Sequence, residues 1–177
     1  FGTDGIRGIA NEMLTPALAG KVGAALGTLL CREGGAAPVV LIGTDTRLSC
    51  GMLADALASG LCSAGASVVT LGEIPTPAVA FLTKHEHADA GVMISASHNP
   101  YQYNGIKIFD GEGFKLPDEA EERLERIVLD DAPPAHRARP EKIGRKTNGA
   151  ARAADAYVRH LLTALEGTLS GLRIGID

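Results

Sequence analysis

The stretch AGVMISASHNPYQYNGIKIF, residues 90–109, contains two apolar runs separated by a polar loop. The first run, residues 90–94, is continuously apolar, which is typical of a strand buried on both faces of a parallel sheet. The second run, residues 105–109, follows too soon for a helical crossover, so we expect an antiparallel strand near an edge. This stretch therefore predicts a sheet that is parallel in one part and antiparallel in another.

Helices and strands alternate on the N-terminal side of this stretch. Apolar residues recur at helical spacing over residues 15–32, 52–64 and 76–83. Strand-like apolar runs separate these segments at residues 39–42 and 67–71. Such alternation is typical of crossover units with strands in parallel. The predicted fold class is α/β, with a mixed, mainly parallel sheet and helices on both faces.

The C-terminal third predicts a change of domain. A helix that covers core begins at Pro117, and residues 130–150, rich in proline and charge, are expected to form an exposed connection, although their basic residues could attract phosphate. A second helix is expected over residues 153–165 and a strand over residues 172–177. We therefore expect a first domain over residues 1–150 and the start of a second α/β domain over residues 151–177. Because a strand without neighbours cannot pair its backbone groups, the chain is expected to be part of a longer protein.

The composition of the 177 residues argues against several classes of protein. No stretch approaches the roughly 20 apolar residues of a membrane span, and a net charge of -4 gives no basic field for nucleic acid. The three cysteines, Cys31, Cys50 and Cys62, are odd in number and lack CxxC spacing, which fits a reducing compartment. The sequence thus predicts a cytoplasmic protein with no nucleic-acid or membrane partner.

Polar clusters follow three of the expected strands. They are GTDTRLS at residues 43–49, EIPTP at residues 73–77 and SASHNP at residues 95–100. Because ligands of parallel α/β sheets bind beyond the carboxyl ends of the strands, these clusters are predicted to converge on one site.

Cations and a hydroxyl group in and near these clusters suit phosphoryl chemistry. Arg7, Arg47 and Lys107 are cations beside small residues that let backbone amides approach a phosphate. Ser97, with His98 beside it, could carry a phosphoryl group and pass it on. Capping of turns would explain the same short polar side chains, and both interpretations stay open from spacing alone.

Other polar residues give weaker indications of function. His85 and His87 flank Glu86 without a third ligand nearby, so they are expected on the surface and not at a metal. Asp45 is expected to pair with or orient Arg47. Neither a GxxxxGK[ST] loop nor a GxGxxG turn occurs, so no motif supports nucleotide binding.

Four motifs taken together resemble the α-D-phosphohexomutase superfamily. They are FGTDGIRG at residues 1–8, GTDTRLS, GVMISASHNPYQYNGIKIF at residues 91–109, and GFKL at residues 113–116, and the first is most similar to the bacterial phosphoglucosamine mutases. The resemblance covers essentially all of the chain and implies the first domain of these enzymes. It implies interconversion of glucosamine 6-phosphate and glucosamine 1-phosphate through a bisphosphorylated sugar, toward UDP-N-acetylglucosamine and cell-wall synthesis.

The resemblance also implies roles for individual residues. Ser97 would be the phosphorylated serine, with Arg7, His98 and Lys107 around the reacting phosphoryl group and Lys107 as a proton-transfer residue. The period of a strand agrees, because Lys107 should face away from the two isoleucines that flank it. Mg²⁺ would be held by the phosphate of Ser97 and by an aspartate loop of the type DGDxDR, which does not occur before Asp177.

Several alternatives remain open under this resemblance. A sibling phosphomannomutase or phosphoglucomutase would share the serine loop, and a non-catalytic sugar-phosphate binding module would share the fold. Residues 1–177 alone are expected to be inactive, and a homodimer is a candidate assembly.

Overall fold

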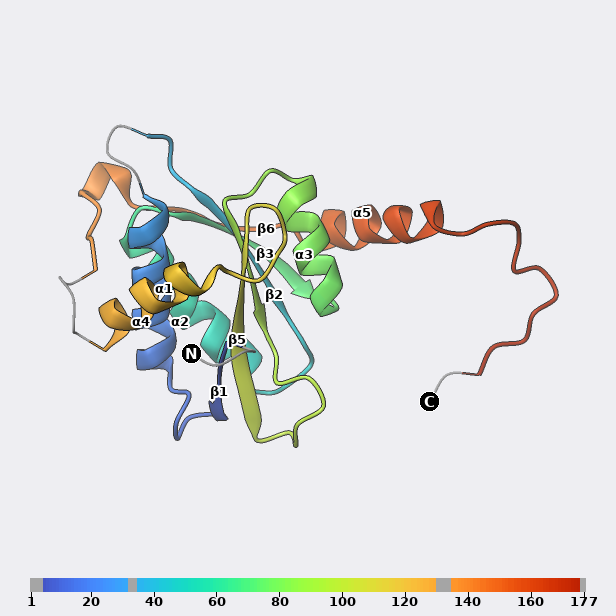
Figure 1. The fold of residues 1–177 in the computed structure, drawn as a ribbon, viewed down its shortest axis with the longest axis horizontal. Coiled ribbons are helices and arrows are strands. Elements are labelled where there is room, and N and C mark those ends of the chain that lie inside the picture. The colour runs from blue at the N-terminus through green and yellow to red at the C-terminus, as the bar shows by residue number, and fades with distance from the viewer. Residues whose placement is uncertain (1–4, 32–34, 130–134, 176–177) are drawn as a thin grey trace.

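The strand predicted from the apolar run at residues 90–94 lies at the centre of the sheet, with all of its side chains buried. The computed structural model describes residues 5–31, 35–129 and 135–175. Within them, one six-stranded sheet has the order β1-β5-β4-β2-β3-β6 (Figure 1). The strands are β1 (Ile6–Ile9), β2 (Val39–Thr44), β3 (Ser67–Glu73), β4 (Ala90–Ile94), β5 (Tyr103–Asp110) and β6 (Lys146–Asn148).

The pairing of the strands confirms the mixed, mainly parallel sheet. β2 runs parallel to both β3 and β4, and β6 extends the parallel part beside β3. β5 pairs antiparallel with β4, as predicted, and β1 pairs antiparallel with β5. β5 is therefore the second strand from the edge and not the edge strand itself.

Helices cover both faces of the sheet, as predicted (Figure 1). The helices are α1 (Pro16–Leu30), α2 (Cys50–Ser63), α3 (Thr76–His85), α4 (Asp118–Val128) and α5 (Ala150–Thr163), with a 3₁₀ turn η1 (Pro140–Lys142). α1, α2 and α4 enclose one core cluster, and α3 and α5 contribute to the other. Neighbouring strand residues such as Leu41 and Ile42 belong to different clusters because side chains alternate across a sheet.

Two strands were not predicted from the sequence. β1 has only four residues, and Arg7 and Gly8 interrupt its apolar pattern. β6 lies inside the expected connection over residues 130–150, where it pairs with β3 although all three of its side chains are exposed. The described part of this connection is mostly exposed, as predicted, but residues 140–142 and 146–148 adopt regular structure that the sequence did not indicate. Residues 130–134 lie outside the described part of the chain.

The C-terminal segment differs from the prediction at both ends. α5 begins at Ala150, three positions before the expected start, and buries Ala153 and Ala156 in the core cluster of α3 and β3. Residues 172–175 form no strand, because no neighbouring strand lies beside them among the described residues, and this segment extends away from the sheet (Figure 1). The domain boundary at residue 150 stays a prediction.

Candidate active site

The carboxyl ends of three parallel strands meet at one edge of the sheet. Thr44 at the end of β2 is in register with Glu73 of β3 and with Ile94 of β4. The polar clusters at residues 43–49, 73–77 and 95–100 therefore leave the sheet side by side. The three clusters thus lie at the same edge of the sheet, as predicted, while their use in one site stays a prediction.

The serine loop, residues 95–103, presents Ser97 in an unusual backbone conformation. Ser97 is exposed and has a φ of 57°, in the left-handed region that glycine favours. Its N–H donates to Ser95 Oγ at 3.0 Å, and its Oγ lies 3.3 Å from His98 Nδ1. Backbone strain of this kind costs about 1–3 kcal/mol, so surrounding contacts must hold it.

Arg47 supplies most of those contacts. Its Nη1 donates to the carbonyl oxygens of Pro100 and Tyr103, both at 2.8 Å. Its Nη2 donates to the carbonyl oxygens of Ser97 and Asn99, at 2.9 and 2.8 Å. Since a hydrogen bond to a charged group contributes about 1.5–3 kcal/mol, these four bonds outweigh the strain at Ser97.

Asp45 orients the guanidinium group, as the sequence predicted for this pair. Its Oδ2 accepts from Arg47 Nε at 3.0 Å, and its Oδ1 accepts from the Arg47 backbone N–H at 3.0 Å. Burial alone would raise the pKa of Asp45, but hydrogen bonds from Ser95, Cys50 and Arg47 outweigh it and lower the pKa. Asp45 is therefore a carboxylate at neutral pH and fixes Arg47 through both its charge and its shape.

Cys50 and Asn104 complete this network, and sequence reasoning missed both. Cys50 Sγ donates to Asp45 Oδ1 at 3.0 Å, and Asn104 Nδ2 donates to Cys50 Sγ at 3.3 Å and to Ser49 Oγ at 2.8 Å. Burial, with a smaller effect of Asp45, raises the pKa of the Cys50 thiol to about 11, so the thiol stays protonated as a donor. The available signal was Asn104 itself, a polar residue beside an apolar run.

Arg7 and Lys107 approach the serine loop from the antiparallel strands. Arg7 is in register with Gly105, whose carbonyl oxygen accepts from the Ser95 N–H at 3.0 Å. A side chain at residue 105 would lie 3.1 Å from Arg7 Cγ and 2.8 Å from the Ser95 carbonyl oxygen, so glycine is needed for this close approach. Lys107, two residues along β5, therefore shares a sheet face with Arg7.

The predicted orientation of Lys107 is confirmed. Ile106 and Ile108 are buried in the cluster beneath α1, α2 and α4. Lys107 instead pairs with Met93, which belongs to the cluster of α3 and α5. The N-terminal motif reaches the same place, because a Cβ at Gly5 would lie 3.3 Å from Lys107 Cα. Residues 1–4 of that motif lie outside the described part of the chain.

The predicted site residues are thus brought to one edge of the sheet, in two groups. Hydrogen bonds connect Arg47 with Ser97, and Ser97 with His98. Strand register places Arg7 and Lys107 on the neighbouring β1 and β5. All five N–H donors of the Arg47 side chain are used within this network, so the phosphate contact expected of it would require the loss of one of these bonds.

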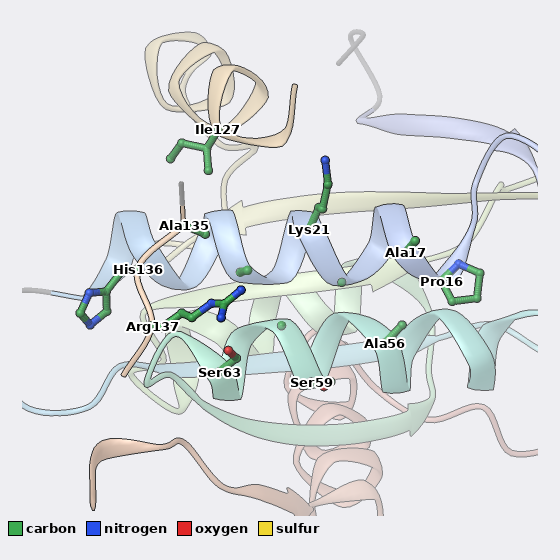
Figure 2. Close-up of a pocket in the computed structure, with 13 residues that line it drawn as sticks. Pro16, Ala17, Lys21, Ala56, Ser59, Ser63, Ile127, Ala135, His136 and Arg137 are labelled. Carbon is green, nitrogen blue, oxygen red and sulfur yellow. The ribbon is translucent and has the colours of Figure 1, made fainter. Parts of the chain in front are cut away.

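A separate groove lies on the helical face of the molecule. It encloses about 540 Å³ between α1 and α2, beneath α4 and residues 135–137, and none of the predicted site residues lines it. Arg137 points between the two helices (Figure 2), near Ser63. The basic segment at residues 135–137 therefore borders this groove and not the serine loop.

Further findings bear on metals, disulfides and membranes. Among the described residues, no group of three or more His, Cys, Asp and Glu side chains is placed to hold a metal ion. His85 and His87 are exposed, as predicted. All three cysteines are free thiols. No helix in the described ranges has the length and apolar character that a membrane crossing requires.

Known proteins are similar to this chain in sequence and in fold. Phosphoglucosamine mutases of Acetivibrio thermocellus and Corynebacterium glutamicum are 50% and 49% identical to the chain over all of its length. The chain spans 39% and 40% of the lengths of these two relatives. A putative phosphomannomutase from Thermus thermophilus superposes on 94% of this chain, and 36% of its own, with a TM-score of 0.78 and 34% identity.

A second structural relative extends this likeness. A phosphoglucomutase/phosphomannomutase family protein from Burkholderia thailandensis has a TM-score of 0.72 and 28% identity over 89% of this chain and 34% of its own. The family described as phosphoglucomutase/phosphomannomutase, alpha/beta/alpha domain I, matches residues 1–134. That match includes the serine loop, Arg47 and Lys107, and the chain belongs to this family.

Proposed function

We propose that Ser97 carries the phosphoryl group of a sugar-phosphate mutase whose substrates are glucosamine 6-phosphate and glucosamine 1-phosphate. The observation that carries this proposal is the exposed Ser97 hydroxyl, on a strained loop that four hydrogen bonds from Arg47 hold in place, with Asp45 orienting the arginine. A turn-capping role alone would not require an exposed serine in the left-handed region. Residues with backbone strain of this kind cluster at active sites and ligand-binding sites.

The proposed reaction moves a phosphoryl group in two balanced steps. The bond between phosphorus and Ser97 Oγ breaks while a sugar hydroxyl oxygen bonds to phosphorus, which gives a bisphosphorylated sugar. The proton of that hydroxyl leaves, and Ser97 Oγ gains a proton. After the sugar turns over, its other phosphoryl group returns to Ser97 by the reverse of these changes.

Lys107, Arg7 and His98 are proposed to assist this transfer. Lys107 would move a proton or stabilise charge, since it lies on the face of β5 opposite the buried Ile106 and Ile108. His98, with Nδ1 3.3 Å from Ser97 Oγ, is close enough to exchange a hydrogen bond with the hydroxyl. Arg7 would attract phosphate from the neighbouring β1, where it faces the same side as Lys107.

The residues described here do not by themselves form a metal centre. A phosphoryl group on Ser97 would offer oxygen ligands, which suit Mg²⁺, but no cluster of carboxylates lies beside it among the described residues. We therefore propose Mg²⁺ only for a longer protein, with a phosphoryl oxygen on Ser97 as one ligand. The division into residues 1–150 and 151–177, a homodimer and a cytoplasmic location are part of the same proposal.

The preference for glucosamine phosphates rests on the names of the relatives at about 50% identity. A phosphomannomutase or phosphoglucomutase of the same family is the alternative, supported by the name of the structural relative from Thermus thermophilus. The test is turnover of the full-length protein on the 6-phosphates of glucosamine, mannose and glucose, with Mg²⁺ and a sugar bisphosphate present. We expect the highest kcat/KM for glucosamine 6-phosphate. Binding of all three without turnover would instead indicate a non-catalytic module.

A further inference from the structure

The hydrogen bonds of Arg47 impose an orientation on the backbone of the serine loop. Four carbonyl oxygens, those of Ser97, Asn99, Pro100 and Tyr103, point toward one guanidinium group. These four residues lie within a span of seven positions, so one side chain binds four of the seven carbonyl groups of residues 97–103. The Arg47 side chain is only 11% exposed, which places the group beneath the loop and away from solvent.

The same orientation decides what the outer side of the loop presents. In a trans peptide the carbonyl and the following N–H point in opposite directions, and the described residues contain no cis peptide bond. Because the carbonyls of Ser97 and Pro100 point at Arg47, the N–H groups of His98 and Tyr101 point away from it. An anion on the side of the loop away from Arg47 therefore meets these two N–H groups, which attract it, and not the four carbonyl oxygens, which would repel it.

The charge of Arg47 is already balanced within the network. Asp45 accepts from Nε at 3.0 Å, and its own Oδ1 accepts from Cys50 Sγ, so the ion pair is fixed on both sides. Ser95 connects this pair to the loop, since it hydrogen-bonds to Asp45 and its Oγ accepts the N–H of Ser97. The left-handed conformation of Ser97 is thus held from its carbonyl side by Arg47 and from its N–H side by Ser95.

We propose that Arg47 is a positioning residue that keeps Ser97 in its left-handed conformation and turns four loop carbonyls away from the phosphoryl group, without contacting phosphate itself. This inference rests on the proposed transfer through Ser97. Lysine at position 47 keeps the positive charge but has three donors on one nitrogen, so it cannot reproduce the five bonds of the planar group. A residue that binds phosphate by charge would tolerate that change better.

The test compares Arg47→Lys with the wild type in the full-length protein, with glucosamine 6-phosphate as substrate. We expect kcat to fall about 100-fold, as for a misplaced reacting group, while KM changes by less than about threefold. Arg139→Lys, which alters an exposed arginine before η1, serves as the matched control and should behave as wild type. An unchanged kcat, or a raised KM at normal kcat, would overturn the inference, and the latter would indicate direct phosphate binding.

Two further measurements keep the outcome decisive. If Arg47→Lys does not fold, the Ser95→Ala and Ser95→Thr variants test the positioning network instead. A kcat that falls in Ser95→Ala and is restored in Ser95→Thr would support the network. A normal kcat in Ser95→Ala would refute it. The phosphate content of Ser97 in the wild type, measured by mass spectrometry, separates the two levels of the argument. Wild-type protein that never carries phosphate on Ser97 would refute the proposed function and this inference with it, whereas phosphorylated wild type with a fully active Arg47→Lys variant would refute the inference alone.

Discussion

Two of the polar clusters follow strands at the same edge of the sheet, but their loops differ in structure. The loop after β3, residues 74–75, leads directly into α3, and its backbone is tied to β2 by the bond from the Ile74 N–H to the Thr44 carbonyl at 3.0 Å. The serine loop after β4 is instead held by a side chain of another loop, Arg47, and contains a left-handed serine. Both loops share their position at a strand end, and a left-handed residue held by a side chain of another loop distinguishes the serine loop from the loop after β3.

The largest expected effect separates the hydroxyl groups of the two loops. Ser97→Ala should remove nearly all mutase activity of the full-length protein while the fold is retained, because the phosphoryl carrier is lost. Thr76→Ala, which removes the hydroxyl at the start of α3, is the matched control and should keep normal turnover. Steady-state kinetics and circular dichroism of both variants test this prediction. Equal losses of turnover in the two variants would contradict the proposed difference between the two loops.

A large effect is also expected at Lys107. Lys107→Met keeps the length of the side chain, and Lys107 lies outside the cluster that contains Ile106 and Ile108, so the melting temperature should change little. Turnover should fall by about 10²- to 10⁴-fold if the proton or charge of Lys107 acts in the reaction. Thermal unfolding measured beside kcat checks both parts. Near-normal turnover would rule out this role, and unfolding would rule out the orientation of the strand.

A smaller effect is expected at Ser95, which contacts the backbone of Ser97 and not the reacting atoms. Ser95→Ala removes one acceptor for the Ser97 N–H, a loss of about 1 kcal/mol, so turnover should fall by about fivefold to tenfold. Steady-state kinetics of Ser95→Ala and Ser97→Ala would compare the loss of kcat in the two variants. If the two variants lose equal activity while folded, both serines act as caps of the turn.

The last expected effect concerns the stability of the fold and its dependence on pH, and not turnover. The pKa of Asp45 is lower in the folded protein than in the unfolded chain, so Asp45 stabilises the fold above its unfolded pKa of about 4, and this contribution is lost as the pH falls through the folded pKa. Asp45→Asn should therefore be less stable than wild type at pH 7, by about 1–3 kcal/mol, and the gap should narrow below about pH 4. Urea unfolding at several pH values tests this, and a gap independent of pH would show that Asp45 acts through shape alone.

The sequence predicted the central sheet better than its edges. β4 is buried throughout and β2 over its four central residues, so their apolar composition alone reveals them, whereas β3 is only partly buried and is revealed by its β-branched residues. β1 and β6 are short edge strands, and the exposed side chains of β6 carry no apolar pattern. Their pairing depends on the neighbouring strands β5 and β3, which a local pattern does not contain.

The sequence proposed the residues of the candidate site but not their arrangement. Ser97, His98 and Lys107 were proposed because their residue types suit phosphoryl chemistry and because they match the motifs of the resembled family, and their roles stay predictions. The role of Arg47 could not be deduced, because its partners are carbonyl groups 50 to 56 positions away. A sequence does not show which backbone oxygen atoms a side chain reaches. A sequence shows which side chains carry charge, and only the fold shows which donors are already used.

The central claim is that Ser97 carries the phosphoryl group, and phosphate mapping tests it most directly. The full-length protein is incubated with a glucosamine bisphosphate and Mg²⁺, digested, and sequenced by mass spectrometry. We expect one phosphate per chain, on Ser97 and not on Ser95, and its loss when glucosamine 6-phosphate is added without bisphosphate and converted onward. Phosphate on another residue, or a protein that turns over with Ser97 never modified, would contradict the account.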